Sequence, residues 1–206
     1  MQNAPRDRIL RAVLLISWAA GGVAEASGPC ARATPSATLA GPGEPGERLV
    51  VTGTVFAPDG VTPAAGVFLY VYHTDAKGYY SREHGAPPRL QGWMKTGPDG
   101  RYEYRTIVPA PYPGRAIAAH VHTQLWGGGY APQWNTDLLF EGDPFLTGKE
   151  RDESGRLGRF AFIRPAPRDE RGVRHAVHDL RLKPSGDRFS GNILHGMGPC
   201  GIRPQS

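Results

Sequence analysis

Short runs of apolar residues, rich in Val, Ile, Phe, Tyr and Thr, recur along the chain between turns that contain glycine, proline and aspartate. Such runs predict β-strands, because branched and aromatic side chains pack well on a pleated, half-buried surface. The runs that we expect to form strands are 49–56, 67–73, 102–107, 118–125, 138–140, 159–163 and 177–182. Beyond residue 26, no long stretch shows a clear helical period. The pattern therefore predicts an all-β fold, an antiparallel β-sandwich of about seven or more short strands with long irregular loops.

The run 67–73 is apolar on both of its faces. One face carries two valines and a leucine, and the other carries a phenylalanine and two tyrosines. A strand with one solvated face would instead show polar residues at alternate positions. This run therefore predicts a strand in the middle of a packed domain.

The first 26 residues differ in pattern from the rest of the chain. Three arginines precede the apolar run 12–20, and the small residues around Ala24 and Ala26 follow it. This order is typical of a secretory signal peptide, whereas a membrane span needs about 20 apolar residues. We expect cleavage near Ala26 and export of the mature protein to the periplasm or the extracellular space. A buried N-terminal helix is the alternative.

Charge narrows the function classes once this segment is set aside. The formal net charge of +5 falls to +4, because the segment carries three arginines and two acidic residues. The remaining basic residues are scattered along the chain, whereas a nucleic-acid-binding face needs them gathered in a stripe. We therefore expect a small-molecule ligand and no nucleic acid.

Residues 27–47 are small and turn-rich, and we expect them to form an irregular lead-in to the domain. The only two cysteines, Cys30 and Cys200, lie near opposite ends of the mature chain. In an oxidising compartment such a pair can form a disulfide that ties both ends to the body of the domain. Two unpaired thiols are the alternative, and the sequence leaves this choice open.

The sharpest local feature is a pair of histidines, His120 and His122, in the run 118–125. Residues two apart on a strand point to the same side, so both imidazoles leave one face of the strand together. Two neutral imidazoles aimed at one point are suited to a metal ion. A pair of half-exposed strand histidines without a metal is the alternative.

Two tyrosine-bearing loops precede this pair. Tyr112 stands among three prolines and a glycine in 107–114, a stiff setting that can hold a phenol in place, and Tyr79 and Tyr80 follow the strand 67–73 in a turn. Phenolate oxygens are hard anionic ligands that suit a high-valent ion, and tyrosine ligates iron in catalase. Two phenolates and one hydroxide would balance the charge of Fe(III).

At this point the chain resembles the intradiol ring-cleavage dioxygenases, a family that includes protocatechuate and catechol dioxygenases. The resemblance covers about 49–182, and its specific segments are 67–81, 96–115, 118–122 and 138–144, in the family's order. It implies that 48–206 form an intradiol dioxygenase-like β-sandwich domain that holds one non-haem Fe(III). The implied iron ligands are Tyr80, Tyr112, His120 and His122, with Tyr80 and His120 equatorial and Tyr112 and His122 axial.

The resemblance also implies an activity. The substrate would be a small aromatic diol, cleaved by O2 between its two hydroxyl-bearing carbons to a muconate-type diacid that contains both oxygen atoms. Tyr112 would act first as a ligand and then as a base. Arg115 is the candidate catalytic cation, with Arg105 as a second candidate. The implied assembly is a monomer or a homodimer.

Two positions depart from the family pattern. Ile117 and Ala118 stand where relatives usually carry Arg-Pro, and Asp137 stands where relatives often carry Gln. Both family residues are associated with stabilising charge on the substrate ring. The departures leave the ligand set complete but make the identity of the catechol an open question.

The other aromatic residues and histidines have less specific expected roles. Candidate pocket walls are Trp93, Trp126, Tyr79 and Tyr130, each of which also suits ordinary packing. The other histidines are expected at surface or turn positions, namely His73, His84, His175, His178 and His195. Two other functions fit parts of the sequence: a non-catalytic transthyretin-like β-sandwich binding module, and a copper or zinc site on the histidine pair.

Overall fold

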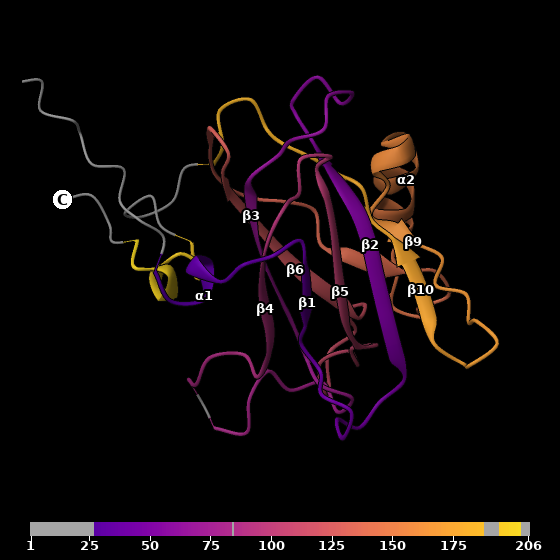
Figure 1. The fold of residues 1–206 in the computed structure, drawn as a ribbon. Helices are drawn as coiled ribbons and strands as arrows, with labels where there is room; N and C mark the ends of the chain where they lie inside the picture. The colour runs from indigo at the N-terminus through magenta and orange to yellow at the C-terminus, as the bar shows by residue number, and fades with distance from the viewer. Residues whose placement is uncertain (1–26, 84, 188–193, 203–206) are drawn as a thin grey trace, which may run out of the picture.

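The computed structural model describes residues 27–83, 85–187 and 194–202, whose strands form two sheets (Figure 1). The first sheet has the order β1 (Ser36–Thr38), β5 (Arg101–Ile107), β2 (Arg48–Phe56) and β10 (Arg174–Val177), and β11 (Leu180–Arg181) also pairs with β2. The second sheet has the order β4 (Leu90–Lys95), β3 (Val67–His73), β6 (His120–Gly127), β8 (Leu138–Phe140) and β9 (Ile163–Arg164), and β7 (Tyr130–Trp134) pairs with β6. The described helices are α1 (Gly28–Ala31), α2 (Gly148–Arg156) and the 3-10 helices η1 (Gly158–Phe160) and η3 (Gly198–Cys200).

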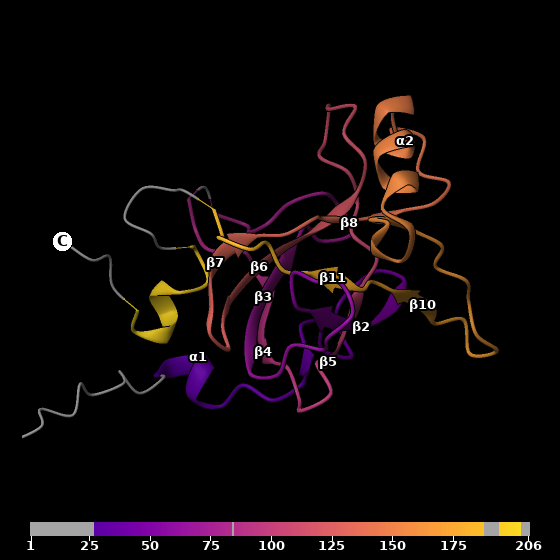
Figure 2. The same cartoon turned by 90° about the horizontal axis from the view of Figure 1, so that it is seen from above.

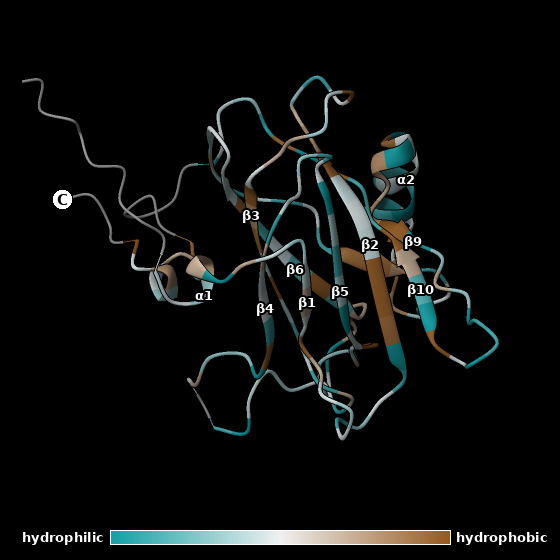
Figure 3. Cartoon of the chain, viewed as in Figure 1, coloured by the Kyte–Doolittle hydropathy of each residue, from teal (hydrophilic) through white to brown (hydrophobic). Residues whose placement is uncertain are grey.

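The two sheets pack as layers around one hydrophobic core. Figure 2 shows β3, β4, β6 and β7 on one side and β2, β5, β10 and β11 on the other. Core residues come from both layers, with Leu49 and Val51 on β2 facing Leu69 on β3 and Val121 and Leu125 on β6. Figure 3 shows a hydrophobic stretch in β2 next to its hydrophilic end. The two packed sheets are the layers that the expected all-β sandwich requires.

The expectation of a purely antiparallel arrangement is wrong, because both sheets are mixed. The central pairs are antiparallel, namely β2 with β5, β3 with β4 and β3 with β6. Parallel pairs join β1 to β5, β10 and β11 to β2, and β9 to β8. Each parallel pair includes a strand of two to four residues that reaches its place by a longer connection, because a tight hairpin joins only antiparallel neighbours.

Several expected boundaries also change. The expected strands 67–73 and 138–140 are observed as predicted, and those at 49–56, 102–107 and 118–125 shift by one or two residues. The expected strand 159–163 is wrong, since 158–160 form η1 and β9 begins only at Ile163. The expected strand 177–182 divides into β10 and β11. The lead-in 27–47, expected to be irregular, contains α1 and β1.

The outer face of the second sheet is covered at one end by both termini of the described chain. Cys30 in α1 and Cys200 in η3 form a disulfide, which settles the choice that the sequence left open. The segment 194–202 packs with them on aromatic side chains of β3 and β6. Trp93 donates a hydrogen bond of 2.8 Å from Nε1 to the carbonyl of Gly196. The same face carries the histidine pair, at the start of β6.

The expected signal segment, residues 1–26, lies outside the described residues. Within the described residues, no helix is long and apolar enough to cross a membrane.

Candidate metal centre

His120 and His122 leave β6 on the outer face of the second sheet, as their spacing predicts. His122 pairs with Tyr72 of β3 across the ladder, and their rings lie 4.6 Å apart between centroids. The chain before β6 is fixed by Asp143, whose Oδ2 accepts a hydrogen bond of 2.9 Å from the backbone N–H of Ala119. The turn after β8 therefore holds the start of the histidine strand.

Tyr80 is placed by a turn that follows β3. Asp75 Oδ1 accepts hydrogen bonds from the backbone N–H groups of Lys77 and Tyr79, at 2.9 and 3.1 Å, and closes the turn locally. Gly78 takes a positive φ of 85° in the middle of this turn. The backbone N–H of Arg89 then donates to the carbonyl of Tyr80 at 2.7 Å. The phenol is thus held by backbone bonds on both sides.

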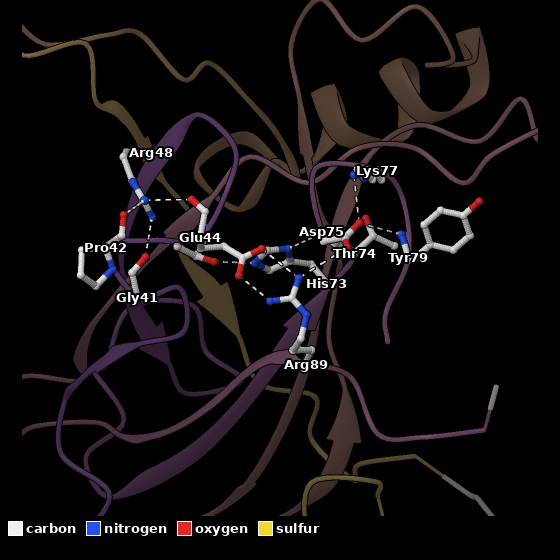
Figure 4. Close-up of polar contacts among 11 residues, drawn as sticks. Gly41, Pro42, Glu44, Arg48, His73, Thr74, Asp75, Lys77, Tyr79 and Arg89 are labelled. Carbon is white, nitrogen blue, oxygen red and sulfur yellow. Dashed lines mark hydrogen bonds and ion pairs between the residues drawn. The ribbon is translucent and has the colours of Figure 1, made fainter. Parts of the chain in front are cut away.

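A charged cluster supports the same turn from outside (Figure 4). Arg89 lies between two carboxylates, with Nη2 at 2.8 Å from Glu44 Oε1 and 3.4 Å from Asp75 Oδ2. The hydrogen bond from Arg89 lowers the pKa of the Glu44 carboxyl. Arg89 is 36% exposed, so solvent screening keeps the energetic contribution of these pairs modest.

Tyr112 is placed against Tyr80 by contacts between their two loops. The hydroxyl of Thr74 donates to the carbonyl of Ala110 at 2.6 Å, and the N–H of Ala110 donates to the carbonyl of Asp75 at 3.1 Å. A Cβ atom added at Gly78 would lie 2.2 Å from the carbonyl oxygen of Pro111. The loops therefore interlock at close range.

The four side chains predicted as iron ligands come together in the structure. Their donor atoms form a closed ring in which each contacts two others. Tyr80 Oη lies 2.8 Å from His122 Nε2, His122 Nε2 lies 3.2 Å from His120 Nε2, and Tyr112 Oη lies 3.1 Å from His120 Nε2. Direct contact between the two phenol oxygens closes the ring. Ligands held about 2 Å from one ion at right angles are themselves about 3 Å apart, so these spacings fit one metal ion.

The hydrogen bonds behind the histidines fix which ring nitrogen faces the centre. His120 Nδ1 lies 2.7 Å from the carbonyl oxygen of Ala118, and His122 Nδ1 lies 2.9 Å from Asp137 Oδ2. Both partners are acceptors, so each Nδ1 carries the proton and each Nε2 presents a lone pair. Two lone pairs 3.2 Å apart repel each other unless a cation or a proton lies between them. The donor set therefore fits a bound cation.

Tyr80 points to the same conclusion. Burial raises the pKa of its hydroxyl well above the ordinary value, and the hydrogen bond to Tyr112 adds to the effect. A phenolate at this position therefore needs a neighbouring positive charge. A cation at the centre of the ring would supply this charge and would allow both phenols to act as anionic ligands.

The predicted cationic residues lie outside this ring. Arg115 is exposed, and its backbone N–H donates to the carbonyl of Tyr112 at 3.2 Å, so it borders the tyrosine loop without a described side-chain bond to the ring. The expectation for Arg105 is wrong, because it lies on β5 of the other sheet and its guanidinium pairs with Glu103 at 2.9 Å. The histidine pair lies on β6 of the second sheet, whereas Arg105 lies on the first sheet.

Most of the expected pocket-wall residues serve other roles. Trp93 and Trp126 belong to the aromatic cluster beneath the segment 194–202, and Tyr130 packs on the core between the sheets. Tyr79 is 54% exposed, and its phenol points away from Asp75 and Arg89 (Figure 4).

An aromatic side chain that the sequence pattern did not indicate lies beside the site. Trp134 on β7 meets His122 edge to face at 6.1 Å between ring centroids, and it meets His195 in the same way at 5.9 Å. Because β7 was not predicted as a strand, nothing in the pattern linked Trp134 to the histidine pair. The available signal was the pair Gly128-Gly129 between β6 and β7, because two glycines between strand-like runs are typical of a β-hairpin.

Two of the other histidines correct the expectation of surface positions. His73 is fully buried, with contacts of 2.7 Å to the carbonyl of Thr74 and 2.6 Å to the hydroxyl of Thr106. His178 is also buried. His175 and His195 are exposed as expected, and His84 lies outside the described residues.

A family model described as "Dioxygenase" matches residues 28–156, more than half of the chain. Catechol 1,2-dioxygenase 1 of Acinetobacter lwoffii is 36% identical over 125 residues, which cover 51% of this chain and 40% of that protein. Protocatechuate 3,4-dioxygenase beta chain of Burkholderia cepacia is 37% identical over 117 residues, covering 50% of this chain and 49% of that protein. The chain thus spans about half the length of these curated relatives, or less.

Solved structures agree at the level of the fold. The dioxygenase domain of a dioxygenase carbohydrate-binding protein fusion from Streptomyces sp. SirexAA-E superposes with a TM-score of 0.56 at 24% identity, covering 75% of this chain and 90% of that one. Wild-type catechol 1,2 dioxygenase of Acinetobacter radioresistens gives a TM-score of 0.59 at 20% identity, covering 76% of this chain and 61% of that one. At these identities the likeness describes the fold alone.

Proposed function

The chain belongs to the intradiol ring-cleavage dioxygenase family, and we propose that it uses O2 to split a catechol-type ring between the two hydroxyl-bearing carbons. The closed ring of two phenol oxygens and two imidazole nitrogens carries this proposal. A binding module of the same fold has no need to gather four such groups at one point. The product would be a muconate-type diacid that contains both atoms of O2.

Tyr80, Tyr112, His120 and His122 would hold one non-haem Fe(III) per chain. Phenolates are hard anionic ligands that favour a ferric ion over Zn(II) or Cu(I), and two phenolates with one hydroxide balance its charge. The bound ion would act as a Lewis acid that draws electron density from the catecholate ring and makes it reactive towards O2.

The two phenols differ in how firmly the chain holds them, which suggests different roles. Tyr80 sits in a turn closed by Asp75 and bonded to the backbone of Arg89. Tyr112 is followed by exposed residues 113–117, so its loop meets solvent on one side. Tyr112 is therefore the phenol better able to leave the centre when the diol binds. Its freed Oη would then take a proton from a substrate hydroxyl.

Substrate binding would use the same sheet face, beside the Tyr112 loop. Arg115 borders the Tyr112 loop, and its backbone N–H donates a hydrogen bond to the carbonyl of Tyr112. It would stabilise negative charge that develops on the ring. Ile117 is 42% exposed and offers this region an apolar contact in place of a charged one.

The proposal is tested by colour, metal content and product together. The purified protein should contain one iron per chain and show a visible phenolate-to-iron charge-transfer band. Tyr80→Phe and Tyr112→Phe should shift or bleach this band, and His120→Ala should lose iron. His175 is an exposed histidine on β10, so His175→Ala is the matched control and should change neither the iron content nor the visible band.

Oxygen uptake on a panel of catechol, protocatechuate and hydroxyquinol should identify the substrate. Labelled O2 should place two heavy atoms in a ring-opened diacid, read by mass. A colourless protein that takes up no iron during growth with ample iron contradicts the proposal. A tetragonal Cu(II) signal in its place would favour a copper site on the histidine pair.

We also propose that the protein is exported and that residues 1–26 are removed. The disulfide between Cys30 and Cys200 supports this, because such bonds persist in oxidising compartments and are rare in the cytosol. Expression of the full sequence followed by cell fractionation should recover the protein outside the cytoplasm, with a mass that lacks about the first 26 residues. A full-length cytoplasmic product with reduced thiols would contradict export.

A further inference from the structure

We propose that Asp137 is a positioning residue of the metal centre, which holds His122 in the tautomer and orientation that present Nε2 to the ion. The inference rests on the proposed function, since it concerns the same centre. His122 Nδ1 lies 2.9 Å from Asp137 Oδ2, and the two side chains are 19% and 32% exposed. This contact is short and shielded enough to fix the ring, which a solvent-exposed pair would not do.

The backbone brings the two residues together. In the antiparallel ladder between β6 and β8, His120 pairs with Leu139 and Val121 pairs with Leu138. The next step of this register sets Asp137 opposite His122. The carboxylate therefore comes from the end of a paired strand and not from a free loop tip, so its position is defined by the same ladder that places the imidazole.

Asp137 could instead be read as a third protein ligand, because His120, His122 and Asp137 offer ligand atoms within 4.8 Å of one another. Two histidines and one carboxylate are a known ligand set for non-haem Fe(II). The geometry favours positioning. His122 Nε2 faces the phenol oxygen of Tyr80 at 2.8 Å and His120 Nε2 at 3.2 Å, whereas the carboxylate meets the other ring nitrogen. An ion at the centre of the donor ring would therefore have the imidazole between itself and the carboxylate.

The two histidines differ in what stands behind them. His120 Nδ1 meets a neutral acceptor, the carbonyl oxygen of Ala118, at 2.7 Å, whereas His122 Nδ1 meets a carboxylate. A carboxylate partner raises the basicity of a ligating imidazole more than a carbonyl does, because it carries a full negative charge. Among the described residues, the ion pairs include no cation that competes for Asp137. Its charge is therefore directed at His122, which becomes the stronger imidazole donor of the pair.

The test uses the iron-loaded protein and three readouts that do not depend on turnover. Asp137→Ala should lower the affinity for iron by about 10-fold to 100-fold in competition with citrate, which is the range typical for removing such a partner. The phenolate-to-iron band should shift as the donor strength of His122 falls. In the metal-free protein, 15N NMR should show the proton of His122 on Nδ1 in the parent and a mixture of tautomers in the variant.

Two further variants keep the result interpretable. Asp137→Asn retains an acceptor oxygen without the charge, and it should keep the tautomer but lose part of the iron affinity. It also serves if the alanine variant does not fold. Asp169→Ala is the matched control, because Asp169 Oδ2 pairs with the exposed His175 at 3.0 Å and its removal should leave all three readouts unchanged.

The outcomes separate the two proposals. A parent protein without iron or a phenolate band overturns the proposed function. A parent with both, together with an Asp137→Ala variant of equal iron affinity, unmoved band and unchanged tautomer, overturns the role of Asp137 alone. Complete loss of iron from Asp137→Asn, with the tautomer intact, would show that the carboxylate is a ligand and would also overturn positioning.

Discussion

The hydroxyl of Thr74 donates a hydrogen bond of 2.6 Å to the carbonyl oxygen of Ala110. This bond joins the loop that carries Tyr80 to the loop that carries Tyr112. The N–H of Ala110 returns a bond of 3.1 Å to the carbonyl of Asp75, so the loops are tied twice. The meeting of the two phenols therefore depends on backbone contacts as well as on the phenols themselves.

Gly78→Ala should separate these loops. Gly78 has a φ of 85°, and an added Cβ would lie 2.2 Å from the carbonyl oxygen of Pro111 and 2.8 Å from Cδ of Pro113. The neighbours are backbone and a proline ring, which cannot move aside without moving Tyr112. We expect loss of most bound iron and of the visible band, measured by metal analysis and absorption after purification under identical conditions.

Gly114→Ala is the control for this substitution. Gly114 also has a positive φ, at 71°, but an added Cβ has no neighbour within 4 Å. Both variants therefore share a backbone strain of about 1 kcal/mol, and only Gly78→Ala adds the clash. Equal iron content in the two variants would show that strain alone, and not the loop contact, explains any loss.

Asp143→Ala should weaken the histidine strand. Its carboxylate accepts hydrogen bonds of 2.9 Å from the N–H groups of Ala119 and Phe145, and Ala119 is buried. An unpaired buried N–H costs about 1–3 kcal/mol, so the free energy of unfolding should fall by that amount. Urea denaturation of the metal-free protein measures the change. Asp143→Asn should lose less, because its one amide oxygen can still serve one of the two donors, and an equal loss would contradict this assignment.

The sequence predicted the parts of the site that depend on local rules. The period of a strand put His120 and His122 on one face, and the run 67–73 was recognised as an interior strand because both of its faces are apolar. The meeting of Tyr80 and Tyr112 came instead from the resemblance to a family, since no local rule relates two loops 32 positions apart. The structure brings all four together, and their ligation of iron remains a prediction.

Contacts that depend on the pairing of strands far apart in the sequence could not be predicted. The contact between His122 and Asp137 requires the register of β6 with β8, and the sequence marked Asp137 only as a departure from a pattern. The helix α2 was not predicted, because it is almost wholly hydrophilic and shows no apolar period (Figure 3). Thr147 and Glu150 form a capping box, which is a sequence signal for the start of a helix. The burial of His73 was not predicted, because its partner Thr106 lies on the other sheet.

The burial of His73 should make stability depend on pH. Burial lowers the pKa of His73 to about 4 from its ordinary value near 6.5. Between these values the unfolded chain binds a proton that the folded chain does not, so the free energy of unfolding should fall as the pH decreases. The slope from this residue is at most about 1.4 kcal/mol per pH unit.

Denaturant titrations at several pH values between 4.5 and 7.5, with a chelator present, measure this slope. His73→Gln removes the titrating group and should flatten the dependence, while lowering stability at neutral pH through the loss of the contact with Thr106. His178, whose pKa burial also lowers to about 4, should give a similar flattening as His178→Gln. A slope that neither substitution changes would assign the acid sensitivity to other groups.

Breaking the disulfide should destabilise the domain more than any single change above. Cys30 and Cys200 are 170 positions apart in the sequence, and closing so long a loop restricts the unfolded chain strongly. The chain-entropy model gives about 5 kcal/mol for a loop of this order. Cys30→Ala with Cys200→Ala should therefore lower the urea midpoint, and the reductant that lowers the midpoint of the parent should leave the variant unchanged. Because Cys200 anchors the segment that places His195 beside Trp134, the tryptophan fluorescence of the native state should also change. A parent protein that is insensitive to reductant, with its thiols shown to be free, would contradict the prediction.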